Sequence, residues 1–327
     1  MRAVVAREAG GAEVLEYTEL PDPEVEAGQL LVRVAAAGVN FIDTYRRSGV
    51  YPMPFPHVVG SEGAGEVLAL GSGVAGFEVG DRVSWDNAPG SYAELALVPA
   101  ADAIRLLDGV DAITAAALPL QGMTAHYLVR STFEVRPGHD VLIHAGAGGV
   151  GLLATQLAVT QGARVITTVG SPAKAELSRA AGAADVIDYS TLSDLTAELP
   201  PLVRELTGGA GVHVAYDGVG RATFDASLAS LRRRGMLVLF GGASGQVPPF
   251  DLQRLNAGGS LFVTRPTLGH YTATRDEIEW RMGELLDAVA AGSLNLRIGA
   301  RYPLAEAAEA HRALEGRQTT GKVLLIP

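Results

Sequence analysis

The chain of 327 residues contains no cysteine. This absence excludes disulfide bonds, thiolate catalysis and every metal site built on cysteine. It does not identify a compartment, because a protein without thiols is insensitive to the redox state of its surroundings.

Long apolar runs and a surplus of positive charge are missing as well. No segment reaches the ~20 consecutive apolar residues that cross a bilayer, and the apolar run in MRAVVAREAGG is too short for a signal peptide. The formal net charge of -10 repels nucleic-acid phosphates and anionic lipids. We therefore expect a soluble, cytoplasmic protein that binds neither membranes nor nucleic acid.

The chain does contain the material for a large core. Hydrophobic residues make up 48% of it and charged residues 19%, which is a globular balance. Its length suggests two domains.

Strand patterns dominate the first part of the chain, and strands alternate with helices in the second. The first part predicts strands at 30–37, 63–70, 81–85 and 92–98. The second predicts strands at 141–144, 164–169, 186–189, 212–216, 236–240 and 261–264, with helices at 149–161 and 172–181. The alternation indicates parallel βαβ units, and hence an α/β fold with a β-rich domain and a doubly wound domain.

The pattern changes again after Arg265. Thr274 and Glu277 have the spacing of a capping box and open an amphipathic helix that closes at Gly292. A further helix is expected over 304–315 and a terminal strand over 323–326. We expect this tail to complete the first domain. The predicted domains are 1–122 with 266–327, and 123–265.

A G-x-G-x-x-G motif, Gly146 to Gly151, follows the predicted strand 141–144 and opens an apolar helix. In that context Gly146 permits a tight turn, Gly148 lets the backbone approach a pyrophosphate, and Gly151 lets the helix pack on the strand. The N–H groups at the helix start then face the phosphates. The motif predicts a dinucleotide site.

The end of the next strand indicates which dinucleotide binds. A site for NAD usually has an acidic residue there for the ribose 2′-hydroxyl, but residues 165–173 contain none. Ser171 is predicted to cap a helix that begins at Pro172, so Lys174 lies in its first turn. A cation at this end of a helix opposes the helix dipole. It is favourable if a 2′-phosphate lies beside it, and we therefore predict NADPH.

Other titratable side chains receive structural interpretations. The histidines are expected to be satisfied structural residues, and Asp43 and Glu62 are expected to fix loops. The run Arg232 to Arg234 is interpreted as a solvated helix end. The histidines in question are His57, His126, His144 and His311.

The segments GSEGAGEV at 60–67 and GDRV at 80–83, with the GAGGVG turn, resemble the medium-chain dehydrogenase/reductase superfamily. That superfamily pairs a GroES-like β domain with a Rossmann domain. Its zinc alcohol dehydrogenases have a cysteine and a histidine ligand where this chain has Asn40 and Ser61. We therefore expect no metal, and without a Lewis acid alcohol oxidation is disfavoured.

Longer segments are similar to the zinc-free quinone oxidoreductase (zeta-crystallin-like) branch of that superfamily. They are AAGVNFIDTYRRSGVYP at 36–52, HAGAGGVG at 144–151, YDGVGR at 216–221, SLFVTRP at 260–266 and the ending LLIP. The chain departs from the branch at Gly146 and Gly218, where relatives often have alanine and serine.

The resemblance implies a set of site residues. Asn40, Tyr45 and Tyr51 would line the nicotinamide and substrate cleft. The other implied NADPH contacts are Thr124; Gly146, Gly148, Gly149, Val150 and Gly151 at the pyrophosphate; Gly170, Ser171, Lys174, Tyr189 and Arg317 at the 2′-phosphate; and Val219, Phe240, Gly241, Thr264 and Arg265 along the remaining path.

Roles for the three cleft residues follow from their chemistry. Asn40 can donate a hydrogen bond to a carbonyl oxygen that gains negative charge, or it can simply tie down its own loop. Tyr45 and Tyr51 can stack on a flat ring, or they can be ordinary half-buried aromatics.

The resulting hypothesis is an NADPH-dependent quinone reductase that works without zinc. The first alternative is NADPH-dependent reduction of an activated C=C bond in an enone, alkenal or enoyl thioester. The alternative from another class is a non-enzymatic NADPH-binding protein, crystallin-like or RNA-binding. The apolar edge at 260–266 further implies a homodimer, because in this branch it joins two subunits into one sheet.

Overall fold

The computed structural model describes residues 1–107 and 109–327. The chain forms two compact units. Unit 1 comprises 1–121, 274–287 and 296–327, and unit 2 comprises 122–273 and 288–295. Segments 266–273 and 288–295 group with unit 2, whereas the sequence-based boundaries placed them with the first domain.

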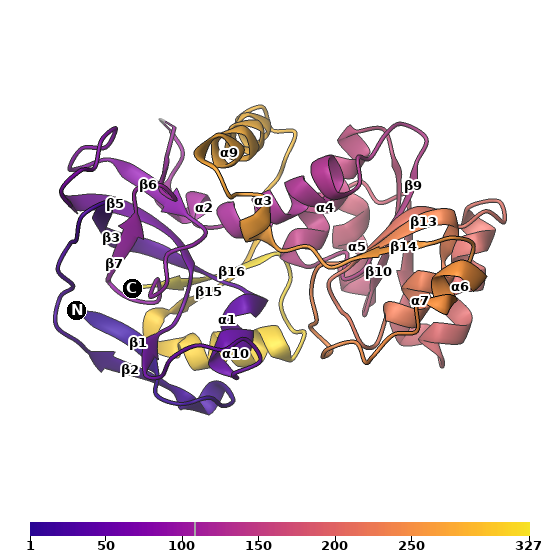
Figure 1. Ribbon diagram of the computed structural model, residues 1–327, viewed down its shortest axis with the longest axis horizontal. Coiled ribbons are helices and arrows are strands. Elements are labelled where there is room, and N and C mark those ends of the chain that lie inside the picture. Colours follow the sequence, from indigo (N-terminus) through magenta and orange to yellow (C-terminus); the bar gives the residue numbers. More distant parts are fainter. Residues whose placement is uncertain (108) are drawn as a thin grey trace. The chain divides into compact units, whose positions relative to one another are not determined.

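Unit 1 is built on two sheets (Figure 1). The smaller has the order β2-β1-β4, with β1 at Arg2–Ala6, β2 at Leu15–Glu19 and β4 at His57–Val58. The larger has the order β15-β16-β3-β5-β6-β8, and β7 also pairs with β3. Its strands are β3 (Gln29–Val39), β5 (Glu62–Leu70), β6 (Arg82–Trp85), β7 (Leu95–Pro99), β8 (Ile104–Arg105), β15 (Ile298–Pro303) and β16 (Lys322–Ile326).

Alternation along β3 explains how the larger sheet buries one face. Leu30, Val32 and Val34 are buried, while Arg33 between them is exposed, as expected for a strand of period two. The buried residues join a core that also contains Trp85. The helices that accompany this unit are α1 (Phe41–Arg47), α2 (Ala112–Ala115), α9 (Arg275–Ala290) and α10 (Ala307–Glu315), with 3-10 turns at Ala12–Val14 and Leu304–Glu306.

Unit 2 contains one six-stranded sheet in the order β11-β10-β9-β12-β13-β14, with every pairing parallel. The strands are β9 (Asp140–Ile143), β10 (Arg164–Val169), β11 (Asp185–Asp188), β12 (Val212–Asp217), β13 (Leu231–Leu239) and β14 (Phe262–Thr264). Numbered within the sheet this is the order 3-2-1-4-5-6 of a doubly wound dinucleotide fold. The predicted doubly wound domain is therefore confirmed.

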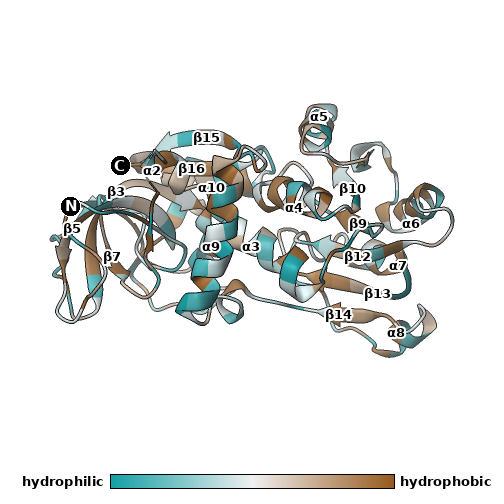
Figure 2. Ribbon diagram, turned by 90° about the horizontal axis from the view of Figure 1, so that it is seen from above, coloured by the Kyte–Doolittle hydropathy of each residue, from teal (hydrophilic) through white to brown (hydrophobic). Residues whose placement is uncertain are grey.

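Helices pack on the faces of this sheet. α4 packs on β9 and β10, α5 on β10 and β11, and α7 on β12 and β13. Figure 2 shows its strands largely in brown, as expected for parallel strands that are covered on both faces. Helix α3 (Pro119–Tyr127) begins in unit 1 and ends in unit 2. The other helical segments of unit 2 are the π-helix Leu128–Thr132, α4 (Gly149–Thr160), α5 (Pro172–Ala180), α6 (Leu195–Leu206), α7 (Phe224–Ala229) and α8 (Gln253–Ala257), with 3-10 turns at Tyr189–Thr191 and Leu268–His270.

Two local predictions are wrong. The strand expected from Tyr92 begins only at Leu95. The arginine run 232–234 lies in strand β13 and not at a helix end. Val212 pairs with Leu231 and Val214 pairs with Met236, so the register between β12 and β13 shifts at the arginines. The three exposed arginines therefore have no partner residues in β12, and Arg234 has a φ of 59°.

The capping box at the start of α9 is confirmed. The Thr274 N–H donates to Glu277 Oε2 at 3.3 Å, and the Glu277 N–H donates to Thr274 Oγ1 at 3.3 Å. Within the described residues, the structure has no helix that is both long and apolar enough to span a membrane.

Candidate active site

The glycine-rich turn lies where β9 ends and α4 begins. A Cβ added at Gly151 would overlap the carbonyl oxygen of Ala145, and one at Gly146 would lie 2.6 Å from Thr167 Cβ. Position 151 therefore requires glycine, because the helix packs closely on the strand, whereas a Cβ at position 146 would require the side chain of Thr167 to move. Gly148 is the N-cap of α4, and within the described chain no side chain caps this helix. Its first N–H groups, at Gly149 and Val150, can bind an anion.

The other implied cofactor residues of unit 2 follow the carboxyl ends of parallel strands. Gly170, Ser171 and Lys174 follow β10, Tyr189 follows β11, Val219 follows β12, Phe240 and Gly241 follow β13, and Thr264 and Arg265 lie at the end of β14. Thr124 lies in α3 and is buried. The strand order reverses between β9 and β12, and ligands of such folds bind at the crevice that this reversal creates.

The start of α5 has the predicted geometry. Ser171 Oγ accepts a hydrogen bond from the Lys174 N–H at 3.4 Å, and Pro172 occupies the first helical position. A Cβ added at Gly170 would lie 2.6 Å from the Tyr189 hydroxyl, so the tyrosine lies directly against the glycine. Lys174 is half-buried in the first turn. A helix start and a lysine together favour a phosphate here.

Gly218 and Gly241 explain one departure from the family pattern. A Cβ at Gly218 would lie 2.8 Å from the ring of Phe240, and one at Gly241 would lie 2.5 Å from the carbonyl oxygen of Gly218. A serine at 218 would therefore require the ring of Phe240 to move.

Arg317 belongs to unit 1, where it is exposed just after α10.

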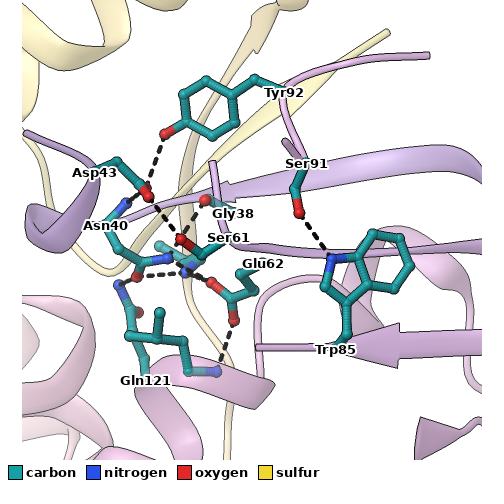
Figure 3. Close-up of polar contacts among 11 residues, drawn as sticks. Gly38, Asn40, Asp43, Ser61, Glu62, Trp85, Ser91, Tyr92 and Gln121 are labelled. Carbon is teal, nitrogen blue, oxygen red and sulfur yellow. Dashed lines mark hydrogen bonds and ion pairs between the residues drawn. The ribbon is translucent and has the colours of Figure 1, made fainter. Parts of the chain in front are cut away.

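Asn40, in unit 1, is 4% exposed and lies between β3 and α1. Its Nδ2 donates to Glu62 Oε2 at 2.7 Å and to the Gly38 carbonyl at 3.3 Å. Its Oδ1 accepts from Lys322 Nζ at 2.8 Å and from Gln121 Nε2 at 3.3 Å. Figure 3 shows these contacts converging on the amide. They favour the second of the two roles predicted for Asn40, that of fixing its loop.

Glu62 and Lys322 form a buried ion pair beneath Asn40, with side-chain exposures of 0% and 2%. The second oxygen of Glu62 accepts the Leu120 N–H at 2.8 Å, at the start of α3. A Cβ added at Gly38 would overlap Glu62 and lie 2.7 Å from Lys322 Cε. The pair therefore requires glycine at position 38.

Asp43 begins a second buried polar chain. It accepts from the Asn40 N–H at 2.9 Å, from the Tyr92 hydroxyl at 3.0 Å and from Ser61 Oγ at 3.3 Å. Burial raises the pKa of Asp43 to about 6, although the bonds from Asn40 and Tyr92 act in the opposite direction. The loop-fixing role expected of Asp43 agrees with these contacts.

Tyr45 and Tyr51 lie together on and just after α1. Their ring centroids are 5.5 Å apart at an interplanar angle of 65°, and the Tyr51 N–H donates to the Tyr45 carbonyl at 3.1 Å. Both rings are half-buried, so each keeps part of its surface for a flat ligand.

Comparisons with known proteins agree with this geometry. The family profile of the alcohol dehydrogenase GroES-like domain matches residues 26–108, and that of zinc-binding dehydrogenases matches residues 149–285. The quinone oxidoreductase of Pseudomonas aeruginosa is 47% identical over 97% of both chains. The chain belongs to the quinone oxidoreductase family.

Two further relatives are informative. A 2-haloacrylate reductase of Burkholderia is 43% identical, covering 99% of this chain and 98% of that one. A mycobacterial structure in complex with NADPH superposes with a TM-score of 0.97 at 51% identity, covering both chains completely. Unit 1 accordingly contains the GroES-like domain of the medium-chain dehydrogenase/reductase superfamily, and unit 2 its Rossmann-type domain.

Asn40 and Ser61, which the resemblance matches to zinc ligands of the alcohol dehydrogenases, both contact side-chain cations in this structure. Asn40 accepts from the Lys322 ammonium, and Ser61 Oγ accepts from the Arg46 guanidinium. Across residues 1–107 and 109–327, no group of three or more His, Cys, Asp and Glu residues is placed to hold a metal ion.

Sequence reasoning missed Lys322, Gln121 and Arg46. Lys322 lies 282 residues from Asn40 along the chain, and the antiparallel pairing of β16 with β3 brings the two together. The available signal was a lysine at the head of the apolar run KVLLIP, where burial requires an anionic partner.

Two of the four histidines have clear structural roles. His144 contacts Thr168 Oγ1 and Ser227 Oγ, both at 2.8 Å, and burial lowers its pKa. His311 contacts Tyr92 and Arg47, which confirms its structural assignment. His57 contacts the Pro54 carbonyl, and His126 is buried in α3.

Proposed function

We propose that this chain is an NADPH-dependent quinone reductase that needs no metal ion. The observation that carries the proposal is the start of α5, where Lys174 replaces the acidic residue of an NAD site beside a capped helix N-terminus. The uncapped start of α4 fits the pyrophosphate of the same dinucleotide. The mycobacterial relative in complex with NADPH and the quinone oxidoreductase of Pseudomonas aeruginosa support it.

The chemistry needs little more from the protein. A bound reduced nicotinamide supplies a hydride, and solvent supplies the proton that completes the hydroquinone. Tyr45 and Tyr51 provide aromatic surface for a flat acceptor. Since Lys322 and Arg46 already bind the oxygens of Asn40 and Ser61, zinc would have to displace a side-chain cation. We therefore expect activity to survive prolonged dialysis against EDTA.

One experiment tests cofactor and acceptor together. In stopped flow, a small quinone should accelerate the loss of NADPH absorbance by the wild-type protein. Lys174→Ala should weaken NADPH binding about tenfold or more, because a charge-assisted hydrogen bond contributes about 1.5–3 kcal/mol, and it should leave NADH binding nearly unchanged. Arg179→Ala, an exposed cation in the last turn of the same helix, is the matched control.

Two outcomes would contradict the proposal. If no quinone accelerates NADPH oxidation, the chain is not a quinone reductase. If Lys174→Ala binds NADPH as tightly as the wild type, the assignment of the phosphate site is wrong.

The second candidate is reduction of an activated C=C bond. It is favoured by the 2-haloacrylate reductase that matches this chain over nearly its whole length. Product analysis after reaction with an enone separates the two, because C=C reduction gives the saturated carbonyl compound. Turnover of enones in preference to every quinone would decide for this alternative.

A further inference from the structure

The hydrogen-bonding capacity of the Asn40 amide is fully used inside the protein. Both hydrogens of Nδ2 are donated, one to Glu62 and one to Gly38. Its oxygen accepts from both Lys322 and Gln121. A primary amide has two hydrogens and two acceptor sites, so no N–H of Asn40 remains for a substrate oxygen.

Gln121 differs from Asn40 in this respect. It is half-buried, whereas Asn40 is 4% exposed. One hydrogen of its Nε2 is donated to Asn40 Oδ1 at 3.3 Å, and in the described part of the chain the second hydrogen has no acceptor. Figure 3 shows Gln121 beside Asn40, and Gln121 comes from the first turn of α3.

Hydrogen bonds fix both the side-chain amide of Gln121 and the backbone next to it. Its side chain is held by Asn40, whose oxygen is in turn oriented by the Lys322 ammonium. Its backbone follows Leu120, whose N–H is bound by Glu62 at 2.8 Å. A donor held in this way loses little conformational entropy when it bonds a ligand.

The Lys322–Glu62 ion pair orients the Asn40 amide and exerts little electrostatic potential of its own on a substrate. Lys322 and Glu62 carry opposite charges in direct contact. Because the two charges are in contact, their potentials largely cancel outside the pair. Their main effect is to hold the amide of Asn40, with its oxygen facing the ammonium and its nitrogen facing the carboxylate.

We propose that Gln121 is the residue that hydrogen-bonds the acceptor's carbonyl oxygen, and that Asn40 is a positioning residue that acts through it. The inference rests on the proposed reductase function. When a quinone accepts a hydride from the reduced nicotinamide, the C–H bond of the donor breaks, an O–H bond forms at one quinone oxygen, and the displaced π electrons settle on the other quinone oxygen. The Gln121 N–H stabilises that oxyanion until water protonates it.

The test uses Gln121→Leu, with Gln29→Leu as the matched control. Gln29 is a half-buried glutamine of the same unit whose side chain accepts the Glu26 N–H. For Gln121→Leu we expect kcat with a small quinone to fall about 10²-fold, while the Kd for NADPH and the urea midpoint stay unchanged. The primary isotope effect with 4-deuterated NADPH should rise, because the chemical step becomes slower; a purely structural role would not produce this combination.

A second measurement does not depend on turnover. We expect the wild type to lower the apparent pKa of bound 4-nitrophenol, read from phenolate absorbance, and Gln121→Leu to abolish that shift. A kcat within twofold of the wild type, or an unchanged phenol pKa, would overturn the role of Gln121 and leave quinone reduction standing. If the wild type turns over no acceptor, the proposed function fails, and the 4-nitrophenol titration alone then decides for or against Gln121.

Discussion

At the scale of single residues, Lys322 and Glu62 form an ion pair that is costly to bury. Both are charged, and their side chains are 2% and 0% exposed. Each charge loses its hydration on folding, and hydrogen bonds replace that hydration: both bond to each other and to Asn40, and Glu62 also accepts the Leu120 N–H. Removing one partner of such a pair is far more destabilising than replacing both.

We predict that Lys322→Met lowers the free energy of unfolding by about 3–5 kcal/mol, because it leaves Glu62 buried and uncompensated. The double variant Lys322→Met with Glu62→Gln should recover most of that loss. Urea unfolding measures both. Arg312→Met is the control, since its ion pair with Glu309 is exposed at 53% and 57%, and an exposed pair is worth less than about 1 kcal/mol. Equal losses for Lys322→Met and Arg312→Met would contradict this.

At the scale of elements, helix α1 is anchored at both ends by buried groups. Asp43 in its first turn binds the Tyr92 hydroxyl, and Arg47 at its end binds Glu315 of α10 at 2.7 Å. His311 of α10 lies between them, 3.0 Å from Arg47 and 3.2 Å from Tyr92. Because a guanidinium only donates, His311 Nδ1 accepts from Arg47 and its Nε2–H faces Tyr92. The histidine is therefore neutral.

This arrangement predicts a dependence of stability on pH. Burial, and then the charge of Arg47, lower the pKa of His311 from 6.5 to about 3. The unfolded chain therefore binds a proton more readily, and the contribution of His311 is complete above about pH 6.5 and lost as the pH falls toward 3. Asp43, whose pKa is raised to about 6, acts in the opposite direction between about pH 4 and 6.

A difference measurement isolates His311. His311→Gln keeps an acceptor and a donor but does not titrate, so the stability of the wild type minus that of the variant should fall by about 1.4 kcal/mol per pH unit from pH 6 to pH 4. Urea unfolding at three pH values gives the slope. A flat difference would mean that His311 is protonated in the folded protein.

The elements also show what the sequence can predict. Strands of the Rossmann sheet were found from their apolar runs, and the cap at Ser171 from residue type alone, because both depend on neighbours in the chain. The irregularity at Arg232 to Arg234 depends on register with another strand, and the partners of Asn40 depend on the pairing of β16 with β3. Spacing along the chain carries no information about such contacts.

At the scale of the whole molecule, the edge of the Rossmann sheet at β14 bears on the predicted homodimer. Strand β14 ends the order of the Rossmann sheet, so within the described chain it pairs with β13 alone. Two of its three residues are exposed and apolar: Phe262 is 55% exposed and Val263 is 36% exposed. An unpaired edge that is also apolar favours pairing with another strand. A two-fold axis beside β14 would supply that strand from a second copy.

We therefore predict a dimer mass in light scattering at micromolar concentration. Phe262→Lys should shift the protein toward monomer, because a charge on the edge strand opposes pairing. Val79→Lys is the control: Val79 is 65% exposed but belongs to unit 1. A wild-type protein that is already monomeric would refute the dimer. A Phe262→Lys variant that stays dimeric would place the interface on another surface. The short length of β14, three residues, would then be what limits edge-to-edge pairing with other chains.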